Sequence, residues 1–89
     1  MELERLRMFL AVAECGSFTE AAKRLFVSHS TMSRAVAALE RELGVPLLRR
    51  NSRSVVLTPA GEVLLDRAEA LLREADALAE AVRSAAEAV

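Results

Sequence analysis

The feature that most constrains the fold is a pair of helix-start signals separated by a very short turn, within residues 17–44. Ser17 is followed by Glu20, the reciprocal capping arrangement that satisfies two free amide groups where a helix begins. Ser28 supplies a second N-cap just before another periodic run. One helix therefore ends and another begins within about three residues, a spacing that predicts a helix-turn-helix.

The second of these helices, predicted over residues 29–43, has two contrasting faces. Its apolar face comprises Met32, Ala35, Val36, Leu39 and Leu43. Its other face carries small polar and basic residues: His29, Ser30, Ser33, Arg34, Ala37 and Arg41. Small side chains allow close approach to another surface, and the major groove of B-form DNA, about 12 Å wide, admits such a helix. The alternative, a merely solvated face, becomes less favoured once the neighbouring turn and basic segments are considered.

The flanking segments complete a small domain. A first helix is predicted over Leu3 to Cys15, ended by Gly16. Beyond Gly44 and Pro46, two short apolar runs, 47–48 and 55–57, flank the sequence RRNSRS at residues 49–54 and predict a hairpin. Three arginines there suit phosphates and a narrow minor groove, although a solvated loop is the simpler alternative.

The last predicted helix begins at Thr58-Pro59 and runs to the end of the chain. Gly61 in its first turn indicates close backbone packing against the preceding domain. Apolar residues recur at alternating intervals of four and three, which is typical of a coiled-coil seam; they are Leu64, Ala68, Leu71, Ala75, Leu78, Val82, Ala85 and Val89. Antiparallel pairing would set Leu against Ala and fill each layer evenly, so we expect an antiparallel homodimer.

From Leu6 through Glu62 the chain resembles the N-terminal domain of LysR-type transcriptional regulators. The resemblance rests on RLRMFLAVAECGSFTEAAKRLFVS, SRAVAALERELGVPLLRR and LTPAGE, in that order. The chief departures are His29 and Ser30, where the family usually has Gln and Pro, and Leu48, where Phe is usual. The resemblance implies a mainly α fold: a winged helix-turn-helix of three helices and a β-hairpin wing over residues 1–58, then a linker and dimerisation helix over 59–89.

The resemblance also assigns DNA contacts to individual residues. It implies base contacts in the major groove from the recognition helix, residues 29–43, and in the minor groove from the wing, residues 49–54; the residues concerned are His29, Ser30, Ser33, Arg34 and Arg53. Candidates for phosphate contact are Lys23, Ser28, Thr31, Arg49, Arg50 and Ser52. The alternative role is helix capping for Ser28 and solvation for the others.

Composition excludes several other classes of protein. No apolar run approaches 18 residues, so we expect one domain and no membrane span. Cys15 is the only cysteine and His29 the only histidine, and no phosphate loop or metal-ligand spacing appears; we therefore expect no enzyme activity, no metal and no cofactor. Residues 1–53 hold nine basic and six acidic side chains, and residues 54–89 hold three and seven, so the first part carries +3 and the second −4.

We therefore expect a cytoplasmic, homodimeric transcriptional regulator that binds double-stranded DNA at an imperfect inverted repeat. A tetramer is compatible with this arrangement in a longer chain. The alternative is a protein-interaction or dimerisation module without sequence-specific DNA binding. LysR-type regulators usually continue into an effector-sensing domain, which this sequence lacks, so we expect a truncated chain or a separated DNA-binding domain.

Overall fold

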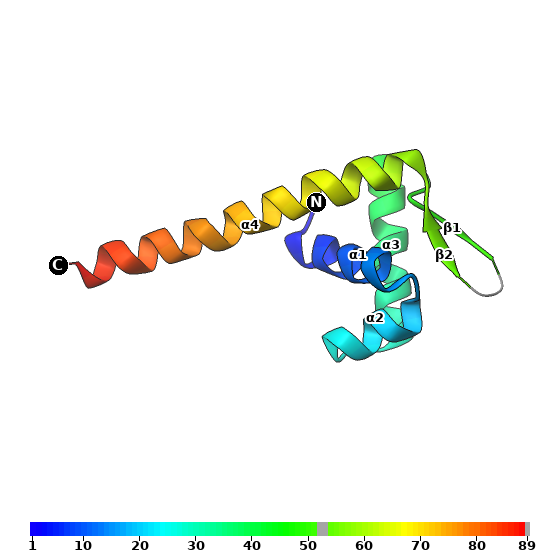
Figure 1. The fold of residues 1–89 in the computed structure, drawn as a ribbon, viewed down its shortest axis with the longest axis horizontal. Coiled ribbons are helices and arrows are strands. Elements are labelled where there is room, and N and C mark those ends of the chain that lie inside the picture. Colours follow the sequence, from blue (N-terminus) through cyan, green and yellow to red (C-terminus); the bar gives the residue numbers. More distant parts are fainter. Residues whose placement is uncertain (52–53, 89) are drawn as a thin grey trace.

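A head of three helices and a β-hairpin carries one long helix that extends away from it (Figure 1). The computed structural model describes residues 1–51 and 54–88. Within these residues the molecule measures 56 × 26 × 18 Å along its principal axes. The elements in order are α1 (Leu3–Cys15), α2 (Phe18–Leu25), α3 (His29–Leu43), β1 (Leu48–Arg50), β2 (Val55–Leu57) and α4 (Pro59–Glu87). The predicted winged helix-turn-helix followed by a long helix is confirmed.

Capping residues set the start of each helix in the motif. The Ser17 hydroxyl accepts a hydrogen bond from the Glu20 amide at 3.2 Å, and the Ser28 hydroxyl accepts one from the Thr31 amide at 3.1 Å. The reciprocal half of the predicted capping box is not formed among the described residues, because the Glu20 carboxylate lies 3.6 Å from the ammonium of Lys23 instead. One side-chain cap is therefore sufficient to begin α2.

The turn between α2 and α3 contains a residue whose backbone is in the left-handed helical conformation. Phe26 has a φ of 57° and its amide donates to the carbonyl oxygen of Lys23 at 3.3 Å. This conformation is uncommon for a residue with a large side chain. It reverses the chain within three residues, and α3 packs against both α1 and α2.

The core lies where α1, α2 and α3 meet. Phe9, Val12, Met32, Val36 and Leu39 are completely buried, and their contacts join α1 to α3. The rest of the core consists of Leu6, Ala11, Phe18, Ala21, Ala22, Leu47, Leu48, Ala68 and Leu72. Burial of these apolar side chains makes the main favourable contribution to the free energy of folding of this small head.

The hairpin depends on this core for support. β1 and β2 are antiparallel, with Leu48 opposite Leu57 and Arg50 opposite Val55. Leu48 is buried in the core and Leu57 packs against it. The Val55 amide also donates to the carbonyl oxygen of Gly16 at 3.3 Å, which ties the hairpin to the turn before α2. A two-stranded hairpin is marginal alone, and these contacts hold it in place.

The start of α4 is locked to the chain that precedes the hairpin. The Thr58 hydroxyl accepts from the Gly61 amide at 3.0 Å and donates to the Pro46 carbonyl oxygen at 2.8 Å. A Cβ atom at residue 61 would overlap the backbone carbonyl oxygen of Leu47. The predicted close packing at Gly61 is therefore confirmed, and only glycine fits there without movement of the backbone.

Only the first half of α4 packs on the head. Ala68 and Leu72 are buried against it, and Asp76 forms an ion pair with Arg7 of α1, with 3.1 Å between the charged atoms. Beyond Asp76 the helix extends away from the head (Figure 1). Over the described residues, none of the helices combines the length and apolar character needed to cross a membrane.

We predict that Gly61→Ala lowers the free energy of unfolding by about 3 kcal/mol, because the added methyl group meets backbone rather than a flexible side chain. Gly44→Ala is the matched control. Gly44 has a φ of 73° but open space around it, so the loss there should be only about 1 kcal/mol. Urea denaturation followed by circular dichroism measures both, and equal losses would contradict the proposed close contact.

Candidate nucleic-acid interface

The helix α3 buries one side and presents the other to solvent. Met32, Ala35, Val36 and Leu39 are buried, and they recur at the spacing of one helix face. His29, Ser30 and Arg34 are exposed and Ser33 is half-buried. The four residues predicted to contact bases in the major groove therefore lie together on the outer side of the first half of α3.

Hydroxyl groups gather where α3 begins. Besides capping the helix, the Ser28 hydroxyl donates to the Thr31 hydroxyl at 2.8 Å and lies 3.2 Å from the hydroxyl of Ser30. The alternative interpretation of Ser28 as a capping residue is thus correct. Its predicted phosphate contact remains a prediction, and any such contact would have to share the hydroxyl with the cap.

Some basic side chains of the head are paired with acidic groups and others are not. Arg7, Arg24 and Lys23 are paired with carboxylates, at 3.1, 2.7 and 3.6 Å respectively. Across residues 1–51 and 54–88, Arg34 and Arg49 make no ion pair or hydrogen bond. Their charges are consequently available to an anionic partner. Pairing lowers the expectation of a phosphate contact for Lys23, although its ion pair is exposed and weak.

The wing carries two exposed arginines in succession. Arg49 and Arg50 are exposed on β1. Asn51 and Ser54 close the hairpin end, with the Ser54 amide donating to the Asn51 side-chain oxygen at 2.8 Å. Ser52 and Arg53, predicted to contact phosphate and the minor groove, lie outside the described residues.

The ring of Phe18, which no motif or periodicity in the sequence singles out, lies between the wing and α3. The guanidinium carbon of Arg50 is 4.2 Å from the centroid of the Phe18 ring, and the His29 ring is 5.7 Å from it, centroid to centroid. A shallow depression of about 210 Å³ opens beside these side chains, lined also by Ser17, Thr19, Asn51 and Ser54. The wing and the start of α3 thus form one continuous polar surface.

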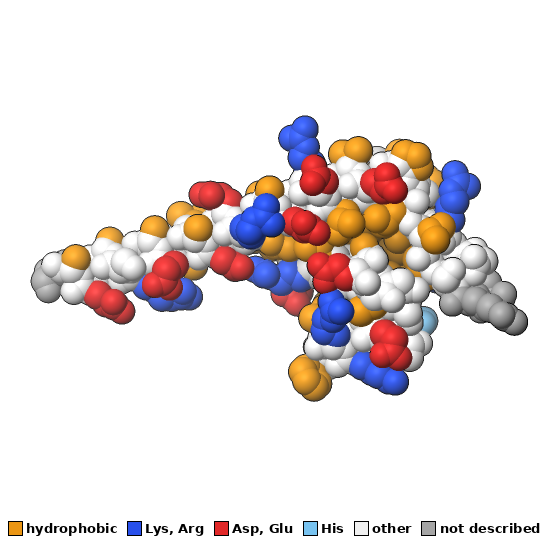
Figure 2. Space-filling view, in the orientation of Figure 1, with side chains coloured by type: hydrophobic (Ala, Val, Ile, Leu, Met, Phe, Trp, Pro, Cys, Tyr) orange, Lys and Arg blue, Asp and Glu red, His pale blue; other side chains and the backbone are white. Residues whose placement is uncertain are grey.

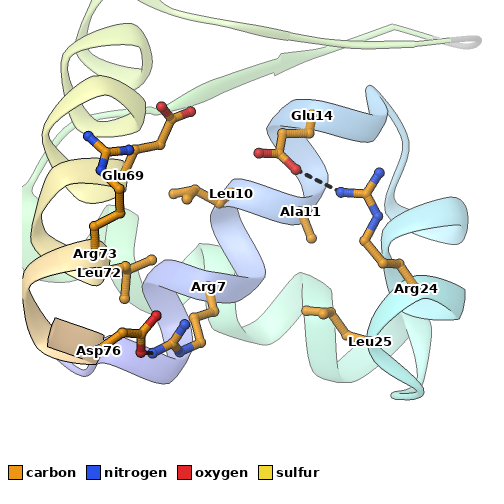
Figure 3. A pocket seen from close by; sticks show the side chains of 10 residues that line it. All are labelled: Arg7, Leu10, Ala11, Glu14, Arg24, Leu25, Glu69, Leu72, Arg73 and Asp76. Atoms are coloured by element: carbon orange, nitrogen blue, oxygen red, sulfur yellow. Dashed lines mark hydrogen bonds and ion pairs between the residues drawn. The ribbon is translucent and has the colours of Figure 1, made fainter. Parts of the chain in front are cut away.

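A larger depression, of about 510 Å³, lies elsewhere, between α1, α2 and α4 (Figure 3). Arg7 pairs there with Asp76, and Arg24 pairs with Glu14 across the opening between α1 and α2. The carboxylates of Glu14, Glu69 and Asp76 line this depression and disfavour a polyanion, although Arg73 there has no ion pair within residues 1–51 and 54–88. The surface formed by α3 and the wing offers the unpaired charges of Arg34 and Arg49 instead.

These features define a winged helix-turn-helix of the kind that binds nucleic acid. Residues 3–62 match the family described as "Bacterial regulatory helix-turn-helix protein, lysR family". The chain therefore belongs to the LysR family of bacterial transcription regulators, which is not a family of enzymes.

Curated relatives agree with this assignment. The HTH-type transcriptional regulator TfdT of Cupriavidus pinatubonensis is 47% identical over 68 residues, which cover 76% of this chain and 30% of TfdT. BudR of Raoultella terrigena, another HTH-type transcriptional regulator, is 55% identical over 62 residues, which cover 70% of this chain and 21% of BudR. The chain thus spans less than a third of the length of these relatives.

Solved structures show the same fold. The complex of the CbnR DNA-binding domain with DNA superposes with a TM-score of 0.93 at 44% identity, covering 97% of this chain and 99% of that one. The complex of the BenM DNA-binding domain with catB site 1 DNA gives 0.93 at 42% identity, covering 97% and 96%. Both of these structures are complexes with DNA, and the similarity extends over almost the whole of each chain.

We predict that Ser28→Ala lowers the stability of the free protein by about 1 kcal/mol, because α3 loses its capping oxygen. Ser30→Ala is the control: its hydroxyl contacts Ser28 but caps no amide, so the change should be within about 0.5 kcal/mol. Thermal and urea unfolding in the absence of DNA measure this difference. An unchanged stability for Ser28→Ala would show that the cap contributes nothing.

Proposed function

We propose that this chain binds double-stranded DNA sequence-specifically and regulates transcription, with the first half of α3 in the major groove and the wing beside the minor groove. The observation that carries the proposal is the outer side of α3, where small polar side chains surround Arg34, which forms no ion pair within the described part of the chain. Arg34 would then contact a guanine edge, with His29, Ser30 and Ser33 reading neighbouring bases. We place this activity in the cytoplasm.

The wing and the turn before α3 would position the head on the DNA backbone. Arg49 forms no ion pair with any residue in 1–51 or 54–88, and Arg50 follows it on β1. Ser28, Thr31 and Lys23 are secondary phosphate candidates for the reasons given above. Arg53 and Ser52 retain the roles that the resemblance to LysR-type regulators assigns to them. Phosphate contacts of this kind fix orientation and carry no sequence information.

The alternative, a protein-interaction module, is not favoured. Such a module would be expected to expose apolar anchors on the surface it uses. The outer side of α3 offers polar and basic groups instead, and the compared structures include DNA complexes of CbnR and BenM.

The second part of the proposal is a homodimer formed through α4, with residues 1–58 as the DNA-binding head and 59–89 as the linker. Leu71, Leu78 and Val82 are 48%, 63% and 62% exposed, and they repeat along one side of the helix. Figure 2 shows hydrophobic side chains recurring along one edge of α4 beyond the head, with most charged groups on the opposite edge. An exposed stripe of this length is typical of a surface that another helix covers.

The predicted seam needs one revision. Ala68 is only 2% exposed because it packs on its own head, so it is left out of the proposed interface. Leu64 is half-buried and stays at the edge of the proposed interface, while Ala75 lies within the exposed stripe. On a helix with 100° per residue, the exposed stripe lies roughly 80–90° from the buried one. One helix can therefore contact its own head and a partner at the same time.

Antiparallel pairing suits the surface beside this stripe. Near the start of α4, a depression of about 330 Å³ is lined by Leu43, Val45, Leu47, Ala60, Val63, Leu64 and Arg67. The partner's α4, running in the opposite direction, would bring its exposed second half toward this apolar region. The heads would then lie at opposite ends of the pair and address the halves of an imperfect inverted repeat, about one or two turns of 34 Å apart.

The test of DNA binding is selection from a random duplex pool, followed by affinity measurement for the selected duplex and for a random duplex. Arg34→Ala should lose about 1–3 kcal/mol per half-site on the selected duplex and much less on the random one. Arg49→Ala should weaken both about equally and reduce the salt dependence. Arg73→Ala, which removes an exposed arginine from α4, is the control. Failure to enrich any sequence would refute the proposed function.

The test of the dimer uses engineered cysteines in a Cys15→Ser background. Leu64→Cys and Val82→Cys chains, mixed and oxidised, should cross-link to each other far more than either links to itself. Ala70→Cys, on another side of α4, is the control and should remain a monomer on a non-reducing gel. Efficient self-linking of Leu64→Cys, with no linking in the mixture, would indicate parallel pairing and contradict the antiparallel arrangement.

A further inference from the structure

Three elements meet at the ring of Phe18. Phe18 is the first residue of α2 and only 5% exposed. On one side, the Arg50 guanidinium of β1 lies over the ring at 4.2 Å from its centroid. On another, the His29 ring, at the first position of α3, approaches to 5.7 Å with the two ring planes inclined at 42°. One buried side chain thus contacts both the wing and the residue that begins the recognition helix.

The ring restrains Arg50 without neutralising it. A carboxylate partner would also hold the guanidinium, but it would cancel the charge that a phosphate needs. Across residues 1–51 and 54–88, no acidic group pairs with Arg50. A ring face offers the guanidinium no oxygen acceptor, so contact with the ring leaves its N–H groups available to donate to phosphate oxygens.

Restraint before binding has an energetic consequence. A free arginine side chain loses up to about 2 kcal/mol of rotamer entropy when it is immobilised at an interface. Contact with the Phe18 ring already restricts the rotamers of Arg50 in the folded chain. The side chain therefore loses less rotamer entropy when it binds a phosphate. The buried ring is itself held by the core, which also contains Ala21 and Val36.

The same ring fixes the wing relative to α3. The Val55 amide donates to the carbonyl oxygen of Gly16, two residues before Phe18, and Val55 is the cross-strand partner of Arg50. The base of the wing is therefore attached at the start of α2 through the backbone and through the ring. His29 contacts that ring from the other element that reaches DNA.

We propose that Phe18 is a positioning residue for DNA binding: its ring orients Arg50 for a phosphate contact and holds His29, and so sets the wing at a fixed place beside the recognition helix. This inference rests on the proposed function, because it assigns Phe18 a role in the DNA contact made by the α3 and wing surface. Phe18 itself does not contact the DNA.

The experiment is a double-mutant cycle between Phe18→Leu and Arg50→Ala, read as affinity for the selected duplex and for a random duplex. Phe18→Leu keeps an apolar core residue but removes the ring. In the unmodified background it should weaken binding to both duplexes by about two- to fivefold, as expected for loss of a cation–π contact. In the Arg50→Ala background the ring has no guanidinium to orient, so Phe18→Leu should weaken binding less than it does in the unmodified chain.

Matched variants separate positioning from stability. Phe9→Leu removes another buried ring, which does not contact Arg50, so it should lower thermal stability without changing affinity at temperatures where the chain is folded. Phe18→Tyr keeps the ring and should retain affinity. If Phe18→Leu leaves the chain unfolded, Phe18→Met provides a second apolar replacement for the same cycle.

A spectroscopic measurement tests the geometry without DNA. The Arg50 side-chain protons over the Phe18 ring should show upfield NMR shifts that vanish in Phe18→Leu and persist in Phe9→Leu. An equal loss of affinity for Phe18→Leu with and without Arg50, or absent ring-current shifts, would overturn the inference. If the unmodified chain binds no duplex while the upfield shifts are present, the proposed function fails and the positioning role fails with it, although the contact itself stands.

Discussion

The rest of the structure depends on the burial of one side of α3. Phe9 and Val12 of α1 cover Met32, Val36 and Leu39 so completely that α3 has only one orientation on the head. Because close-packed interiors resist rotation of a helix, the opposite side is held outward. That side carries small polar residues and an arginine, so packing of the core determines which residues a groove of DNA would meet.

Much of this architecture is predictable because its signals are local. Ser17, Ser28 and Thr58 cap helices at the predicted places, and Gly61 marks the close approach to Leu47. The contact between Phe18 and Arg50 is not local, because it depends on where the hairpin packs on the head. Periodicity in the sequence does not indicate that position. Ala68 illustrates another limit, since heptad spacing alone does not distinguish a residue facing a partner from one facing its own head.

The distribution of charge explains how a chain of net charge −1 can present a basic surface. Acidic residues are concentrated in α4, and most of those on the head already have partners. Glu14 pairs with Arg24, Glu20 with Lys23, Glu2 with Arg5 and Glu42 with the N-terminal ammonium, and Glu40 accepts a hydrogen bond from the Leu47 amide at 2.7 Å. Arg34 and Arg49 are left without such partners within the described parts of the chain. Local potential therefore differs from the overall charge, and the local potential governs attraction to phosphate.

The junction at Gly61 makes α4 a rigid lever. With a rise of 1.5 Å per residue, a rotation of about 10° at this junction would move the far end of the helix by about 7 Å. Such a movement equals the rise of about two base pairs along the DNA axis, at about 3.4 Å each. The contact of Gly61 with the Leu47 carbonyl and the Thr58 hydrogen bonds oppose this rotation. In the proposed dimer, this junction and the packing of Ala68 and Leu72 on the head would together set how far the spacing between two DNA half-sites can vary.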